Sequence, residues 1–163
     1  MNEFRATFQF IKTRFDVRPR LDKLICKQGE YDGCVVLKLQ KASWTNDPMD
    51  QVQNTSGVFF SVWIETKRPH KLRYNVHALK LRELEGYSIT SRDFADEFRK
   101  NFTPMLHSWP NVRIDRGPLT LMEGWLPVDM KRLEGDVVLL MKRFERVSPL
   151  VDRLLQRRKD MAL

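Results

Sequence analysis

The sequence feature that most restricts the fold is a pair of long runs, Val58–Glu65 and Leu72–Leu79, that are rich in aromatic and β-branched residues. The basic segment Lys67–Lys71 lies between them. Two such runs joined by a short loop are typical of a β-hairpin. We therefore predict that this hairpin is the centre of a sheet and that the remaining elements pack around it.

The register of this hairpin can be predicted, because slipping one strand by one residue turns all of its side chains to the opposite face. Centring the loop on Pro69 gives one wholly apolar face and one mixed face. On the mixed face, this register pairs Glu65 with Arg73 and Trp63 with Asn75. Opposite charges on directly facing residues stabilise a sheet, so we expect this register.

The mixed face of the hairpin is the predicted binding site. Trp63 offers a flat aromatic surface, and Arg73 and His77 offer hydrogen-bond donors. Single-stranded nucleic acid is commonly held by aromatic side chains inside a basic groove. The alternative is that a helix covers this face and makes it a second core. With the cations of the turn included, the predicted ligand-binding residues are Trp63, Arg73, Asn75, His77, Lys67, Arg68 and Lys71.

The charge distribution favours an anionic partner. The chain has a formal net charge of +8, and residues 67–82 carry six basic and no acidic side chains. A second excess lies in residues 131–163, which carry nine basic and five acidic side chains. A local basic excess attracts polyanions, although a charge of this size also serves solubility alone. We expect single-stranded nucleic acid as the first candidate partner and an acidic protein surface as the second.

A second hairpin is predicted before the central one, with strands Leu21–Lys27 and Gly33–Trp44. Centring its turn on Glu30 places Cys26 opposite Cys34. These are the two cysteines of the chain, and their spacing matches no zinc or redox motif. We expect two reduced thiols and a cytoplasmic location.

Amphipathic helices are predicted at both ends of the chain and in its middle. Apolar residues recur at helical spacing near the N-terminus, in residues 92–102 and after Asp129. A final helix is expected to restart at Ser148-Pro149, since proline suits a first helical position. Short strands are expected at Val112–Asp115 and Leu119–Trp125. Together these elements predict an α+β fold, with a curved antiparallel sheet of about four to six strands packed by N-terminal, middle and C-terminal helices.

Length and hydropathy favour one globular domain over residues 1–163. No apolar run approaches the ~20 residues that span a bilayer. The N-terminus also lacks the uninterrupted apolar stretch of a secretory signal. We therefore expect no association with membranes, and the sequence does not indicate an oligomeric state.

Sequence patterns for catalysis or for metal binding are absent. None of the common nucleotide-binding, metalloprotease, hydrolase or calcium-binding motifs occurs, and the three histidines have no ligand-like spacing. The predicted register does place Ser61 opposite His77, with Glu65 on the same face. Glu65 is four residues from Ser61, about 13 Å at the rise of a strand, which is too far to orient His77. We assign no catalytic residue, no metal and no cofactor.

The functional hypothesis is a non-enzymatic intracellular binding module that engages an anionic partner, nucleic acid first, through the central hairpin. One alternative is a protein-interaction or adaptor domain, in which the polar loop at 45–57 orders on binding. The other is a small-molecule cleft between the sheet and helix 91–102, with or without catalysis. Whether this protein is an enzyme is therefore left open by the sequence.

Overall fold

The computed structural model describes residues 3–18, 23–53 and 56–160. Its centre is a five-stranded antiparallel sheet in which the strands follow one another in the order β1-β2-β3-β4-β5. Sequential strands are therefore always neighbours, as in a meander. The strands are β1 (Ile25–Tyr31), β2 (Cys34–Gln40), β3 (Gly57–Glu65), β4 (Lys71–Leu79) and β5 (Thr120–Pro127).

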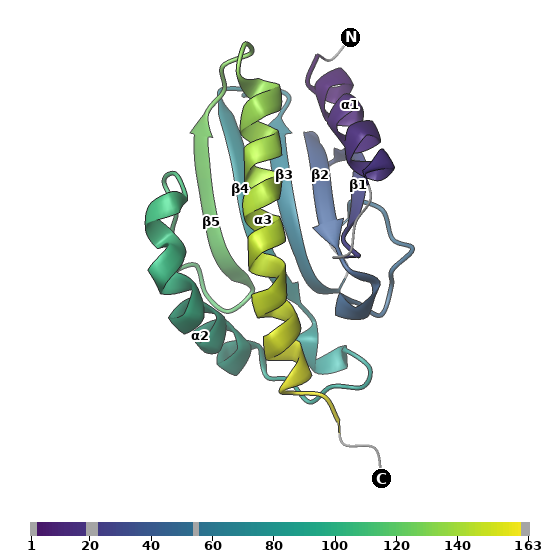
Figure 1. Ribbon diagram of the computed structural model, residues 1–163, viewed down its shortest axis with the longest axis vertical. Coiled ribbons are helices and arrows are strands. Elements are labelled where there is room, and N and C mark those ends of the chain that lie inside the picture. Colours follow the sequence, from purple (N-terminus) through teal and green to yellow (C-terminus); the bar gives the residue numbers. More distant parts are fainter. Residues whose placement is uncertain (1–2, 19–22, 54–55, 161–163) are drawn as a thin grey trace.

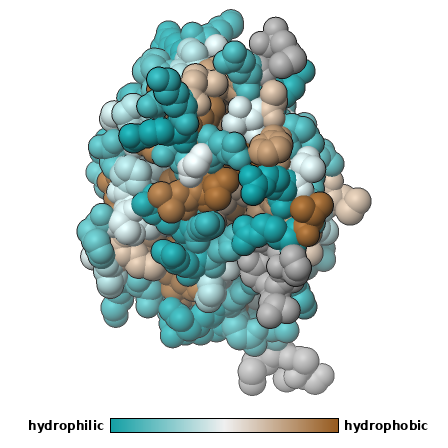
Figure 2. Space-filling view, turned by 45° about the horizontal axis from the view of Figure 1, so that its top comes forward, coloured by the Kyte–Doolittle hydropathy of each residue, from teal (hydrophilic) through white to brown (hydrophobic). Residues whose placement is uncertain are grey.

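Three α-helices in the described residues complete the fold and confirm the predicted α+β class. They are α1 (Glu3–Val17), α2 (Ser91–Phe102) and α3 (Leu133–Gln156). Figure 1 shows α3 running along one face of the sheet, with α1 beside it over β1 and β2 and α2 on the side of β5. The helical side is mostly hydrophilic, with apolar side chains gathered in a band across its middle (Figure 2). Within the described residues, no helix is both long enough and apolar enough to cross a bilayer.

Aromatic side chains between α3 and the sheet form the centre of the core. The ring of Phe60 in β3 stacks on that of Phe144 in α3, with centroids 4.6 Å apart. Trp44 packs edge-on against Phe60, and Trp109 lies against Phe144. Aromatic pairs of this kind stabilise a core by about 0.5–1.5 kcal/mol beyond the area they bury. The predicted apolar face of the central hairpin is thus the face that α3 covers.

The register of the central hairpin differs from the prediction by two residues. Trp63 pairs with Arg73 and not with Asn75, and the loop begins at Thr66 and ends at His70. The amide and the hydroxyl of Thr66, the first residue after β3, both donate to the carbonyl of Gly33 at 3.0 Å. An even shift keeps every side chain on its predicted face.

Two local interactions are consistent with this register. Lys71 pairs with Pro127 of β5, so β4 begins one residue earlier than predicted. Arg73 still reaches Glu65, now diagonally, with Nε 3.8 Å from a carboxylate oxygen. The predicted ion pair therefore exists, but it does not mark directly opposed residues.

The register of the first hairpin was also predicted wrongly. Tyr31 pairs with Cys34 around a two-residue turn, in which Asp32 and Gly33 have φ angles of 50° and 74°. Positive φ at both central residues is typical of a type I′ turn, and Asp-Gly is among its preferred sequences. Cys26 consequently faces Leu39, and the two cysteines are free thiols that do not face each other.

The C-terminal half departs from the prediction at two places. Helix α3 continues through Pro149 and does not restart there. Proline has no N–H to donate to the carbonyl of Glu145, but the hydroxyl of Ser148 donates to that carbonyl at 3.0 Å. The expected strand Val112–Asp115 is reduced to one isolated bridge between Arg113 and Glu123.

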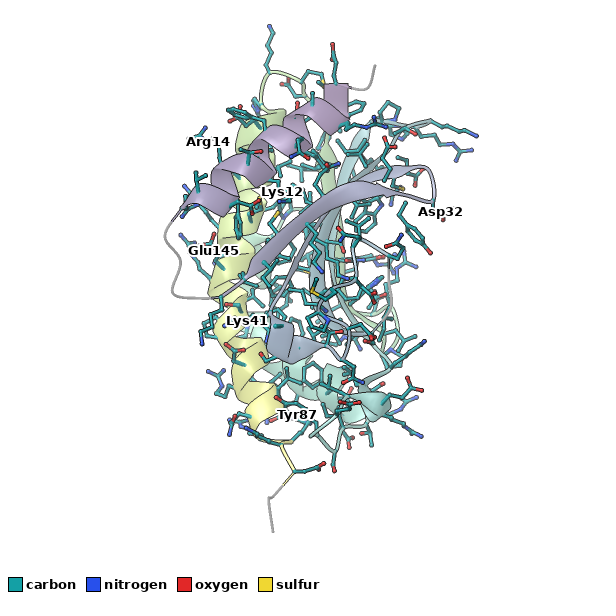
Figure 3. The ribbon with its side chains drawn as sticks, turned by 90° about the vertical axis from the view of Figure 1, so that its right-hand side faces the viewer. Lys12, Arg14, Asp32, Lys41, Tyr87 and Glu145 are labelled. Carbon is teal, nitrogen blue, oxygen red and sulfur yellow. The ribbon has the colours of Figure 1, made fainter. Side chains whose placement is uncertain are left out.

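A single carboxylate joins the end of β2 to the last turns of α3. Asp152 of α3 accepts a hydrogen bond from the indole of Trp44 at 2.8 Å, and it forms an ion pair with Lys41 at 2.6 Å. Lys41 lies against α3 in Figure 3. The segment that leaves β2 is thereby fixed to the helical layer before it turns back toward β3.

Two glycines, one in β5 and one in α3, offer a matched test of how closely Tyr74 packs on β5. A Cβ at Gly124 of β5 would overlap the ring and the hydroxyl of Tyr74 and lie 2.8 Å from the carbonyl of Pro110, whereas one at Gly135 of α3 would meet nothing. We predict that Gly124→Ala destabilises the protein by about 1–3 kcal/mol through overpacking. Gly135→Ala should stabilise it by up to about 1 kcal/mol through helix propensity. Urea unfolding of both variants measures this, and equal effects would contradict the packing of Tyr74 on β5.

Candidate functional site

The face of the sheet opposite α3, here called the polar face, carries buried polar side chains, among them Lys38, Ser61 and Asn75. The register aligns side chains in rows across all five strands. One row is polar from edge to edge and consists of Lys27, Lys38, Ser61, Asn75 and Glu123. The next row contains three large or charged side chains on adjacent strands, Trp63, Arg73 and Trp125.

Residues 45–53, here called the loop, cover one end of the polar face. Lys27 donates to the carbonyls of Pro48, at 2.6 Å, and of Asp50. Lys38 donates to the carbonyls of residues 51 and 53 at 3.2 and 3.4 Å, and it is only 1% exposed. Burial, and secondarily the charge of Lys27, lower the pKa of Lys38. The loop is thus held by two ammonium groups that rise from the sheet.

Val52 of the loop and several side chains of the polar face line a half-open cavity of about 170 Å³, here called the loop cavity. Its apolar walls include Val36 of β2 and Val52 of the loop, and Trp63 forms a third wall. The β1–β2 turn, where Figure 3 labels Asp32, borders it as well. Its polar lining comes from Cys34, Ser61, Asn75 and His77.

Two polar atoms of residues that line this cavity are buried without a hydrogen-bond partner in the described part of the chain. They are Oδ1 of Asn75 and Nδ1 of His77. The other polar atoms of the two side chains meet each other, with Nδ2 of Asn75 2.8 Å from Nε2 of His77. Leaving a buried polar atom unpaired costs about 1–3 kcal/mol, and such atoms are few in native folds.

The environment of His77 favours its neutral form. Burial lowers the pKa of His77, and the charge of Glu123 offsets this only in part. The ring also packs edge-on against Phe59, with centroids 5.4 Å apart. A neutral imidazole offers one donor and one acceptor, and one of these already faces Asn75.

A second concave site, here called the aromatic groove, adjoins the loop cavity on the polar face. It has a volume of about 180 Å³ and is lined by Trp63, Trp125, Lys71, Arg73, Arg113 and Arg116, among others. The ammonium of Lys71 lies 4.4 Å from the centre of the Trp125 ring. Trp63 lines both the groove and the loop cavity.

Most of the cations at the groove have acidic neighbours. Arg116 pairs with Glu123 at 2.7 Å, and Arg113 pairs with Asp115 at 3.0 Å. Pairs on an exposed surface contribute only about 0–1 kcal/mol each. Lys71 has no carboxylate partner among the described residues. The groove can therefore exchange its ion pairs for contacts with an incoming anion at small cost.

The structure brings most of the predicted site residues together. Asn75 and His77 lie at the loop cavity, Arg73 and Lys71 lie at the groove, and Trp63 lies between the two. The other two predicted residues, Lys67 and Arg68, are exposed in the β3–β4 turn and line neither site.

The alternative that a helix covers the polar face is corrected by this geometry. No described helix covers the polar face, because α3 lies on the opposite face and the cover comes from the loop. The space between α2 and the rest of the core is filled by Phe94, Phe98 and Phe102, each 0% exposed. The concave sites on the sheet are bordered by the loop and by β5, and not by α2.

Sequence reasoning missed several residues of the site, Trp125 and Val52 above all. Trp125 reaches the groove because β5 pairs with β4. The residues of these two strands do not by themselves indicate that the strands are neighbours. Val52 lies in a loop whose path is set by contacts with Lys27 and Lys38. The available signal was the length of the polar stretch at 45–57, since long loops in compact domains are often functional.

A larger cleft, of about 530 Å³, lies between α1 and α3. Its apolar floor includes Phe15 and Met141, and its rim carries both signs of charge, including Arg14 and Glu145, which Figure 3 labels. None of the described residues lining it has a buried polar atom without a partner. Nor do three His, Cys, Asp or Glu side chains gather as a possible metal site anywhere in the described residues. The polar face is therefore the better candidate site.

Comparison of the chain with protein-family models, with curated proteins and with solved structures finds no match. The chemistry of the site therefore has to be inferred from its own geometry.

The anchoring of the loop can be tested by removing its two ammonium groups. We predict that Lys27→Met with Lys38→Met accelerates backbone hydrogen exchange in residues 45–53 by about tenfold or more, because hydrogen bonds from charged groups contribute about 1.5–3 kcal/mol each. Lys12→Met, on α1, is the matched control. Mass-spectrometric exchange of native protein gives the readout, and unchanged exchange in the loop would show that these contacts do not hold it.

The lowered pKa of His77 predicts a pH dependence of stability. The unfolded chain has the higher histidine pKa, near 6.5, so it binds more protons than the native state as the pH falls through that value. Stability is therefore lost on acidification from pH 7.5 to 5.5. We expect His77→Gln to reduce this loss in urea unfolding experiments. His107→Gln, at an exposed position, is the control, and an equal pH dependence in wild type and His77→Gln would refute the assignment.

Proposed function

We propose that this protein is a non-enzymatic binding module that holds single-stranded nucleic acid on its polar face. One observation carries the proposal: Trp63 and Trp125 flank Arg73 in a single row on β3, β4 and β5. Neighbouring strands are about 4.8 Å apart, so two aromatic side chains and one guanidinium share a surface about 10 Å wide. Bases stack on such aromatic side chains with little dependence on sequence, at about 1–3 kcal/mol per base.

The cations of the groove supply the second part of the interaction. Lys71, Arg73, Arg113 and Arg116 all line it. Guanidinium groups bind phosphate oxygens in a bidentate manner. Their present acidic partners, among them Asp115 and Glu123, are themselves at the surface, so that phosphates can replace them. Stacking and phosphate contacts thus come from the same few side chains.

The alternative adaptor function has less support. It required a loop at 45–57 that orders on binding, but the described part of this loop is already fixed to the sheet by Lys27 and Lys38. The two free thiols suit a reducing compartment, and we propose a cytoplasmic location on that ground.

Binding of a fluorescent single-stranded oligonucleotide, measured by anisotropy over a range of salt concentrations, tests the proposal. The logarithm of the association constant should fall linearly with the logarithm of salt concentration, by about 0.7 for each phosphate neutralised. Changing Lys71, Arg113 and Arg116 to Ala should reduce the slope by up to about two units. The matched control changes Lys142, Arg146 and Arg153 of α3, exposed on the helical side, and should leave the slope near that of wild type.

Substitution of the groove tryptophan separates stacking from charge. Trp125→Leu keeps an apolar side chain in β5, and it should weaken binding by about 1–3 kcal/mol without changing the salt slope. Urea unfolding verifies that the variant is folded. If the folded wild type fails to bind the oligonucleotide at low salt, the proposed function is wrong. If the α3 variant loses as much binding as the groove variant, the site lies elsewhere.

A further inference from the structure

We infer that two copies of this chain associate through the outer edge of β1, so that their sheets join into one continuous antiparallel sheet. The inference does not depend on the proposed function, because the aromatic groove lies on β3, β4 and β5, away from this edge. It starts from a difference between the two edge strands of the sheet.

The outer edge of β5 is covered by other parts of the chain. Glu123 of β5 and Arg113 exchange two backbone hydrogen bonds, at 2.7 and 2.9 Å. The guanidinium of Arg99 donates to the carbonyl of Thr120 at 2.9 Å. A further strand could pair with β5 only by displacing these bonds.

The outer edge of β1 has no such cover in the described part of the chain. Tyr31 and Cys34 flank a two-residue turn and form a hydrogen-bonded pair. Because hydrogen-bonded and non-hydrogen-bonded pairs alternate along an antiparallel ladder, the backbone N–H and C=O groups of Gln28 and Glu30 point away from β2. No described residue bonds to the backbone of either one. Figure 3 looks onto this edge, where β1 runs up to the turn labelled at Asp32.

The two charged side chains of β1 are both bound within the chain. Charged side chains commonly protect an edge strand from pairing with another chain. The ammonium of Lys27 is turned onto the carbonyls of Pro48 and Asp50 in the loop. The carboxylate of Glu30 pairs with Arg5 of α1 at 2.5 Å. An approaching strand therefore meets no unpaired charge on β1.

The side chains of β1 are complementary to a second copy of the same strand. Ile25 and Tyr31 lie at its two ends, both on the polar face, and each is 44% exposed. Gln28 is the midpoint of the strand. A two-fold axis at Gln28 therefore pairs β1 with itself over its whole length, as an isologous contact requires.

This register brings matching groups together on both sides of the axis. The backbone N–H and C=O of Gln28 bond to those of Gln28 in the second copy. Ile25 of each copy faces Tyr31 of the other, and cross-strand pairs of aliphatic and aromatic side chains stabilise a sheet. Addition of a strand to an open sheet edge is a common mode of protein association, and here the symmetry of the strand selects a second copy as the occupant.

Sedimentation of the native protein at micromolar to millimolar concentrations tests the inference. The mass should rise with concentration from that of one chain to that of two and then stop, because a two-fold contact uses the β1 edge of both copies. The mass of one chain at every concentration would overturn the inference.

Substitution of the two exposed apolar side chains shows whether β1 is the contact. Ile25→Lys and Tyr31→Lys each place an ammonium opposite an apolar side chain of the second copy, and each should weaken dimerisation about tenfold or more. Urea unfolding verifies that the variants are folded. Leu139→Lys is the matched control, since Leu139 of α3 is 46% exposed, and it should leave dimerisation unchanged. Undiminished dimerisation of both folded β1 variants would overturn the inference.

Two substitutions at Gln28 test the register. Gln28→Pro removes an N–H that points away from β2, a position at which an edge strand tolerates proline, and it should give a folded monomer. Gln28→Cys places two thiols across the axis, where the Cα atoms of a hydrogen-bonded pair are about 5.5 Å apart, within the range of a disulfide. Mild oxidation should then crosslink two chains. Arg68→Cys, in the exposed β3–β4 turn, is the control, and crosslinking of Gln28→Cys no faster than this control would overturn the pairing of β1 with itself.

Discussion

The stacking of Phe60 on Phe144 determines which face of the sheet becomes the core. Phe60 lies in the middle of β3, the central strand, and Phe144 lies midway along α3. Because side chains alternate across a strand, burying Phe60 under α3 forces Ser61 and Trp63 to the opposite side. The neighbouring strands follow through their pairing with β3. The chemistry of the polar face is therefore a consequence of a contact made on the other side of the sheet.

The polar side chains buried on the polar face lower the stability of the fold where their hydrogen bonding is incomplete. Lys38, Ser61 and Asn75 are each less than 10% exposed, although burying polar groups is unfavourable unless they are paired. The loop satisfies Lys38 with backbone carbonyls. At Asn75 the pairing is incomplete. Buried polar networks that are only partly satisfied are uncommon in structural cores, which is why we place the site there and not in the larger cleft between α1 and α3.

The sequence predicted correctly on which face of the sheet the residues of the central hairpin lie, but it did not predict which residues pair across its two strands. Alternation of apolar and polar residues from Val58 to Leu79 is a strong signal for orientation, and a shift of two residues does not disturb it. The loop of this hairpin begins at Thr66, which bonds to Gly33 of the neighbouring hairpin, a contact that local sequence does not reveal. The first hairpin was centred wrongly on Glu30, although Asp32-Gly33 is a dipeptide that suits the positive φ angles of its turn. The groove required Trp125, whose place beside Arg73 depends on strand order.

The carboxylate of Asp152 gives the loop a mechanical connection to the far side of the molecule. It holds Lys41 and Trp44, at the point where the chain leaves β2 for the loop. Further along, Val52 lies over Gly29 and lines the loop cavity. The chain from Lys41 to Val52 is therefore held at both ends, by Asp152 of α3 at its start and by Lys27 and Lys38 of the sheet near its end.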